Sequence, residues 1–246
     1  MMEHFDQATP LINLMGISFN YPGDAKILKN LDLRFHRGDR IGLIAPNGSG
    51  KTTLFHMIMG LLKPSEGKME IFGKPVSEEK DFLEVRRRIG LLFQDPDDQL
   101  FCPTVIEDVA FGPLNLGKSK KEAIEVSQKT LHYLGLEGFE HRITSKLSGG
   151  EKRLVSLATV LAMEPEVLLL DEPAAGLDEK TKATLAKVLS DLKLSHILIS
   201  HESDFLAATT DHIYTMKNGK LDSDWDRHIH YYVHTHDKGA HPHSHE

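Results

Sequence analysis

The amino-acid sequence predicts an α/β fold with a mostly parallel sheet, an antiparallel β layer at the amino end and an inserted α-helical subdomain. Strand-like apolar runs dominate the amino third, and strands alternate with helices in the last third, as in βαβ units. The middle third carries three patterns typical of helix starts. A glycine-rich loop between a predicted strand and a predicted helix adds a candidate binding site.

Most elements of the amino-terminal half are predicted to be strands. Apolar runs bounded by turn residues place them at 11–19, 31–35, 40–45, 68–72 and 89–93. The stretch Tyr21–Asp24 has turn chemistry, and a helix from about 51 to 61 is expected to end near Pro64. These strands account for the antiparallel layer and the first part of the parallel sheet.

Three helix starts are predicted where Ser or Thr is followed three residues later by Glu: Thr104–Glu107, Ser119–Glu122 and Ser148–Glu151. In each, the hydroxyl and the carboxylate satisfy backbone N–H groups that the helix leaves unpaired. Strands at 167–170 and 197–200, a helix at 179–192 and a β pair within 213–221 follow. We therefore expect a domain over 1–226, with a helical insert at about 95–160, and a flexible tail over 227–246.

Composition excludes several classes of protein. The net charge of −7 argues against a nucleic-acid partner, and the basic cluster Arg86–Arg88 fits a solvated helix face or salt-bridge partners. No apolar run reaches the ~18–20 residues that span a bilayer, and Glu3 and Asp6 stand where a leader would be basic. The single cysteine, Cys102, fits a reducing cytosol. The chain is expected to reach a membrane only through a partner.

The stretch Ala45–Thr53 has the strand–loop–helix setting of a Walker A phosphate-binding loop. Lys51 is expected to reach the β- and γ-phosphates, and the Thr52 hydroxyl to bind Mg²⁺. Ala45 stands where glycine is usual, and we expect a negative φ to accommodate its methyl group. The residues expected to bind nucleotide here are Asn47, Gly48, Ser49, Gly50, Lys51, Thr52 and Thr53.

Two carboxylates follow a buried strand in the last third. Four apolar residues over 167–170 precede Asp171 and Glu172, as in a Walker B motif. The carboxyl ends of such strands are where ligands bind in open α/β sheets. The alternative is that both residues merely begin a helix.

The sequence Leu147–Glu151 resembles the ABC signature motif, whose fifth residue is usually glutamine. Together with the two Walker motifs, and with His201 after a predicted strand, it makes nearly the whole chain similar to the ATP-binding subunit of an ABC transporter. The resemblance implies a P-loop NTPase (RecA-like) core, with ATP and Mg²⁺ as cofactors. It also implies that the chain is an ATPase whose hydrolysis drives transport.

The resemblance further implies roles for single residues. Asp171 would join Thr52 and Gln94 around Mg²⁺, and Glu172 would be the general base that polarises the attacking water. Gln94 matches the Q-loop glutamine. His201 matches the switch histidine that contacts the γ-phosphate.

A head-to-tail homodimer around two ATP molecules is also implied. Ser148, Gly149 and Gly150 would face the γ-phosphate bound by the other subunit, and Asp178 would lie at the dimer seam. Tyr21 sits where an aromatic ring usually stacks on adenine, although a tyrosine in a turn is also common.

The stretches 92–101 and 104–113 resemble the ATPases of energy-coupling factor (ECF) importers, and closely those of the cobalt and nickel branch. That resemblance implies an integral membrane coupling (T) subunit and a substrate-binding (S) subunit as partners, at the cytoplasmic face of the cell membrane. A coupling helix would rest on apolar side chains that could otherwise be core: Leu100, Phe101, Val105 and Phe111.

The last nineteen residues hold seven of the fifteen histidines: His228, His230, His234, His236, His241, His243 and His245. Imidazole ligands at such spacing suit Ni²⁺, Co²⁺, Cu²⁺ or Zn²⁺, and a tail without a metal role is the alternative. We expect a nickel or cobalt importer motor. A vitamin importer, a soluble ABC ATPase acting on DNA or ribosomes, and a metal store or sensor remain alternatives.

Overall fold

The computed structural model describes residues 9–23 and 26–222. Its larger sheet has six strands in the order β10-β9-β3-β8-β7-β6, parallel except for the terminal pair β9 and β10. These strands are β3 (Arg40–Ile44), β6 (Ile89–Leu92), β7 (Val167–Asp171), β8 (Ser195–Ile199), β9 (His212–Lys217) and β10 (Lys220–Asp222). Every residue of β7 and β8 is buried, as expected for central strands covered on both faces.

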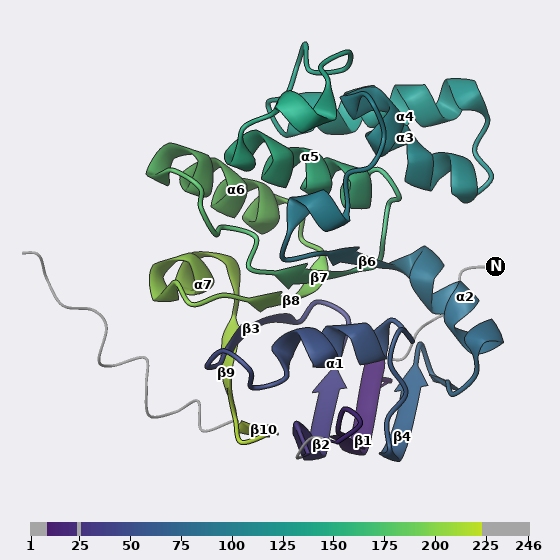
Figure 1. Cartoon of the computed structure of the whole chain (residues 1–246), viewed down its shortest axis with the longest axis vertical. Coiled ribbons are helices and arrows are strands. Elements are labelled where there is room, and N and C mark those ends of the chain that lie inside the picture. The colour runs from purple at the N-terminus through teal and green to yellow at the C-terminus, as the bar shows by residue number, and fades with distance from the viewer. Residues whose placement is uncertain (1–8, 24–25, 223–246) are drawn as a thin grey trace, which may run out of the picture.

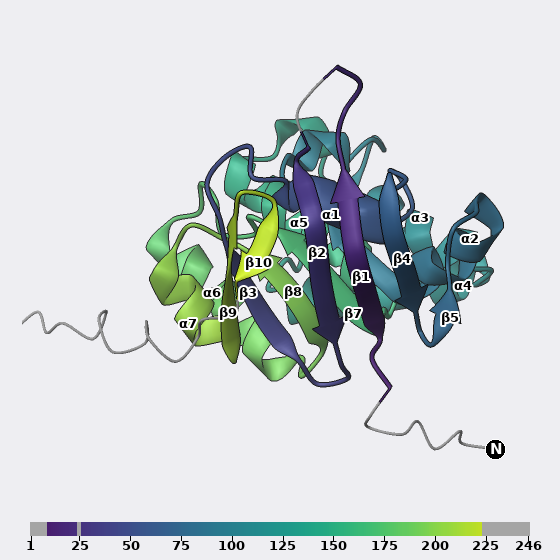
Figure 2. The same cartoon turned by 90° about the horizontal axis from the view of Figure 1, so that it is seen from below.

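The smaller sheet is antiparallel, in the order β2-β1-β4-β5 (Figure 2). Its strands are β1 (Ile12–Phe19), β2 (Leu28–Phe35), β4 (Glu66–Ile71) and β5 (Lys74–Pro75). The register shifts between Leu14 and Ile17, where Gly16 has a φ of +64° that other residues rarely adopt. The antiparallel layer predicted at the amino end is confirmed, whereas β5 was not predicted.

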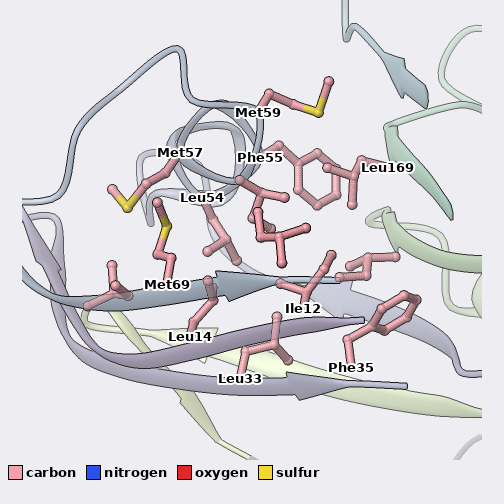
Figure 3. Close-up of a cluster of buried hydrophobic side chains, with 14 of the residues drawn as sticks. Ile12, Leu14, Leu33, Phe35, Leu54, Phe55, Met57, Met59, Met69 and Leu169 are labelled. Atoms are coloured by element: carbon pink, nitrogen blue, oxygen red, sulfur yellow. The ribbon is translucent and has the colours of Figure 1, made fainter. Parts of the chain in front are cut away.

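Helix α1 (Lys51–Ile58) lies between the two sheets and shares its apolar face with both. Leu54 points from α1 toward the strands that carry Ile12 and Leu14 of the small sheet, and the Phe55 ring lies beside Leu169 of β7 (Figure 3). The helix ends three residues before the predicted boundary. Because α1 begins directly after the glycine-rich loop, this shared core fixes the position of that loop.

A layer of helices covers the face of the large sheet that lies away from α1 (Figure 1). It contains α3 (Val105–Asn115), α4 (Lys120–Tyr133), α5 (Gly149–Leu161), α6 (Glu179–Asp191) and α7 (Ser203–Thr209), with the short 3-10 helices η1 (Pro96–Asp98) and η2 (Thr144–Lys146). Each of α3, α4 and α5 begins at its predicted capping box. The division of the chain into domains stays a prediction.

Two helices were not predicted, α2 (Glu79–Arg88) and α7. Only Phe82 and Val85 of α2 are buried, and its last turn holds the basic cluster. Arg86 pairs with Glu79, and Arg88 with Glu166, so these two arginines are salt-bridge partners as expected. In the described part of the chain, no helix is both long and apolar enough to cross a membrane.

Candidate functional site

The loops at the carboxyl ends of β3, β7 and β8 meet at one edge of the large sheet. The phosphate loop follows β3, Asp171 is the last residue of β7 and Glu172 comes directly after it, and His201 follows β8. Since β8 lies between β3 and β7, these segments surround a pocket of about 720 Å³. Its lining includes the predicted residues Tyr21, Asn47, Gly48, Gly50, Lys51, Thr52, Thr53, Gln94, Asp171, Glu172 and His201.

The phosphate loop depends on glycine at its last position. Gly50 precedes α1 with a φ of +97°, and a Cβ there would lie 2.7 Å from Ile27 Cγ2. No side chain caps the first turn of α1. Its backbone N–H groups and the positive end of the helix dipole are therefore available to an anion. The predicted Ser49 is partly buried within the same loop.

Lys51 brings a buried positive charge into the pocket, with only 8% of the residue exposed. Its Nζ donates to the carbonyl oxygen of Ala45 at 2.8 Å and lies 2.9 Å from His201 Nε2. Burial lowers the pKa of Lys51, although Glu172 and Asp171 oppose this shift. Ala45 does not adopt a positive φ, as predicted, so its methyl group causes no backbone strain.

Asp171 and Thr52 form a pair of oxygen donors beside Lys51. Thr52 Oγ1 donates to Asp171 Oδ2 at 2.7 Å, and Asp171 is 2% exposed. Burial raises the pKa of Asp171, and the bond from Thr52 acts in the opposite direction. A hydroxyl and a carboxylate at one point are hard oxygen ligands that fit Mg²⁺.

Glu172 occupies an unusual backbone conformation for a residue with a side chain, with a φ of +49°. Its amide still donates to Ile199 O of β8 at 3.0 Å. Its Oε1 lies 3.1 Å from His201 Nε2 and 3.9 Å from Lys51 Nζ. Burial raises the pKa of this carboxyl, while the charges of His201 and Lys51 lower it. A carboxylate and an imidazole thus face the same point beside the lysine.

Two further predicted residues lie at the rim of the pocket. Gln94 is exposed on the segment that follows β6, close to Thr52. The Tyr21 hydroxyl lies 3.4 Å from Thr53 Oγ1, and its ring meets Phe19 edge-on at 5.0 Å. The tyrosine side chain therefore lies beside the first turn of α1.

The signature residues lie apart from this pocket. Ser148 caps α5, with its Oγ accepting from Glu151 N at 3.3 Å, and Gly149 and Gly150 form the first turn. Asp178 caps α6 by accepting from Lys180 N and Thr181 N. A Cβ on Gly150 would lie 3.3 Å from Leu177, so the starts of α5 and α6 are neighbours. Neither start contributes to the pocket of its own chain.

The sequence profile of the ABC transporter family matches residues 28–175, which contain the phosphate loop, the signature stretch and both carboxylates. The chain belongs to the ABC transporter family. Members of this family are ATP-hydrolysing transporter subunits, so this cassette binds ATP.

A relative and two solved structures narrow the assignment. The energy-coupling factor transporter ATP-binding protein EcfA of Methanocaldococcus jannaschii is 42% identical over 215 residues, which cover 86% of this chain and 77% of that protein. CbiO1 of Clostridium perfringens, part of the ABC transporter complex CbiONQ, has a TM-score of 0.77 and 34% identity over 87% of each chain. An ATP-binding cassette solved as a dimer with ADP and phosphate has a TM-score of 0.78 and 26% identity, covering 86% of this chain and 96% of that one. The cassette is of the energy-coupling factor type.

Two buried charged residues near the site were not predicted. Arg153 of α5 donates to the backbone carbonyls of Phe93 and Gln94. Asp108 of α3 accepts from Phe101 N, Cys102 N and Thr144 Oγ1. Arg153 falls four residues before Leu157, on the apolar face of its helix, and a charge at such a position was the available signal. The seven tail histidines lie outside the described residues. Within residues 9–23 and 26–222, no cluster of three or more potential metal ligands occurs.

Proposed function

We propose that this cassette is the motor of an ECF-type importer for nickel or cobalt ions. The observation that carries the proposal is the convergence of Lys51, Asp171, Glu172 and His201 on one pocket. The likeness to CbiO1 and the histidine-rich end of the chain support the choice of ion. The likeness to EcfA supports coupling to T and S subunits, with the cassette at the cytoplasmic face of the membrane.

Hydrolysis follows from what these residues can do to a bound ATP. The first turn of α1 and Lys51 hold the β- and γ-phosphates, and Glu172 accepts a proton from the attacking water. His201, whose Nε2 lies 3.1 Å from Glu172 Oε1, contacts the γ-phosphate beside that carboxylate. Mg²⁺, when bound, would be held by Thr52 and Asp171 with Gln94 nearby, and it neutralises charge on the phosphate oxygens.

The second half of each ATP site would come from another copy of the chain. Ser148, Gly149 and Gly150 present a hydroxyl and a helix start away from their own pocket, and Asp178 lies next to them. In a head-to-tail pair they would face the partner's γ-phosphate. Closure of the dimer would then depend on bound ATP, and ATP hydrolysis would allow the dimer to open again.

The membrane partner would dock beside Gln94. Phe101 is 66% exposed and stacks edge-on against the exposed Phe111 at 4.8 Å, whereas Leu100 and Val105 are buried in the core. Of the four apolar residues considered from the sequence, only the two phenylalanines can therefore meet a partner helix. An exposed aromatic pair of this kind suits the apolar face of a helix.

The deciding experiment is uptake of nickel, cobalt and a labelled vitamin by cells that express the chain with its native membrane partners. Glu172→Gln is expected to lower ATP turnover by about 10²–10⁴-fold, the usual contribution of a positioned base, and to abolish metal uptake. Glu137→Gln, at an exposed site after α4, is the matched control and should leave both unchanged.

Loss of vitamin uptake with unchanged metal uptake would keep the motor and reject the metal assignment. Unchanged uptake of all three would reject the importer. Deleting residues 228–246 tests the tail separately: a transport motor keeps its ATPase activity, whereas a metal sensor loses its response to added metal.

A further inference from the structure

We propose that Arg153 is a positioning residue that couples the two ATP sites of the dimer. It does so by fastening the Gln94 segment, defined here as Phe93–Gln99, to helix α5. The proposal rests on the dimer described under the proposed function. It adds one residue, absent from the predicted site, through which a change at one site reaches the other.

Arg153 joins the Gln94 segment to α5 by direct bonds. Its Nη1 donates to Phe93 O at 3.1 Å and to Gln94 O at 2.6 Å. Only 7% of Arg153 is exposed, so these bonds are shielded from water. Hydrogen bonds from a charged donor to buried carbonyls are stronger than neutral ones, and they fix the path of the backbone that carries the Gln94 side chain.

The same segment is fastened to α5 at two more points. Gln99 Nε2 donates to Ser156 O at 2.9 Å and to Thr159 Oγ1 at 2.7 Å, and Gln99 Oε1 accepts from Phe93 N at 3.1 Å. Lys152 Nζ lies 2.5 Å from Asp97 Oδ1. With bonds at the beginning, the middle and the end of the segment, it is expected to move together with α5.

Burial of the Arg153 guanidinium must be offset by other interactions, because burying a charge without partners costs free energy. Its Nε has no partner among the described residues, and burial lowers its pKa. The negative charges of Asp95, Asp171 and Glu172 act in the opposite direction. An apolar side chain would fill the same position in α5 without this cost. The bonds to the Gln94 segment are what an apolar residue could not supply.

The two ends of this connection lie at two different ATP sites of the proposed dimer. Gln94 lines the pocket of its own chain, and α5 begins at Ser148, which would face the partner's ATP. A displacement of the Gln94 segment by nucleotide is therefore transmitted along α5 to the start that completes the other site. Coupling of this kind is expected to appear as an energetic interaction between Arg153 and each of the two motifs.

The test is a pair of double-mutant cycles on steady-state ATP hydrolysis by the full chain. Arg153→Met preserves length and removes the donors, and we expect it to lower kcat by about five- to thirtyfold with less than about a twofold change in KM. In the Gln94→Ala and Ser148→Ala backgrounds, the further loss caused by Arg153→Met should shrink to less than about twofold. Arg153→Lys, which keeps the charge and can still donate, should recover part of kcat.

Arg86→Met is the matched control, because Arg86 also donates to two consecutive carbonyls, Met59 O and Gly60 O, but these follow α1 and are not in the Gln94 segment. A loss of kcat in Arg153→Met no larger than in Arg86→Met, or full additivity with both motif variants, would overturn the proposal. If Arg153→Met does not fold, Gln99→Met cuts the same connection and must show the same cycles. The Glu172→Gln variant is assayed in parallel, since its failure concerns the proposed function and not Arg153.

Discussion

Helices α1 and α5 both begin at stretches rich in glycine and serine, yet their first turns differ in what their N–H groups contact. No side chain caps α1, whose loop ends at Gly50 with a positive φ. At α5, Ser148 and Glu151 cap each other, and Glu151 also accepts from Arg142 Nη1 at 2.8 Å. An uncapped helix start with an adjacent lysine can bind phosphate alone, whereas we expect the capped start of α5, with its adjacent glutamate, only to complete a site formed by another chain.

Mixing two inactive chains would test this difference most strongly. Lys51→Met disables the start of α1, Ser148→Arg disables that of α5, and each alone should lower ATP hydrolysis by at least about 10²-fold. A mixed dimer contains one intact pair of starts, so an equal mixture should recover about a quarter of wild-type activity by symmetry.

The control is an equal mixture of two other single variants, Lys51→Met chains and Glu172→Gln chains. Both changes damage the same half of the site, so their mixed dimer has no intact pair and should recover nothing. Without recovery in the first mixture, the start of α5 would have to act within its own chain.

A second test asks what holds the start of α5 in place. Asp108 of α3 is 3% exposed and accepts from two backbone amides and from Thr144 of η2, the short helix that precedes α5 in the chain. Asp108→Ala leaves these buried donors unpaired, and we expect a loss of about 2–4 kcal/mol in the free energy of unfolding. Chemical denaturation measures it. A loss below about 0.5 kcal/mol would mean that water replaces the carboxylate.

The smallest expected effect concerns the unusual glutamate of the signature stretch. The Arg142 bond chiefly lowers the pKa of Glu151, and the amide of Ser148 adds to the shift. A carboxyl with a lowered folded-state pKa adds stability above its unfolded value, and this is lost as the pH falls through the folded value. Glu151→Gln should therefore lower the free energy of unfolding by about 0.3–1 kcal/mol at neutral pH. The variant should also lose less stability than the wild type when the pH is lowered. The free energy of unfolding of this variant, of the wild type and of the control Glu137→Gln, measured at neutral and at acidic pH, checks the direction of the change.

The starts of α1 and α5 could be predicted from the sequence because each is formed by a short run of consecutive residues. The loop before α1 and the cap of α5 are local motifs, as are the carboxylates that end β7. Helix α2 was missed because only two of its ten residues are buried, so its apolar period is too weak to detect. The contact between Arg153 and Gln94 joins residues 59 positions apart, and the amide of Glu172, a residue with positive φ, donates to Ile199 of β8, 27 positions further along the chain. Neither can be read from neighbouring residues.

The separation of the two helix starts bears on how such genes diverge after duplication. A second copy that lost Glu172 or Lys51 but kept the start of α5 would still complete one site with the original chain. A copy with the opposite loss would do so as well, and the pair would hydrolyse one ATP where it once hydrolysed two. Selection can therefore act on each half independently. Arg153 is the exception, because a single change at this residue would disturb both halves at once.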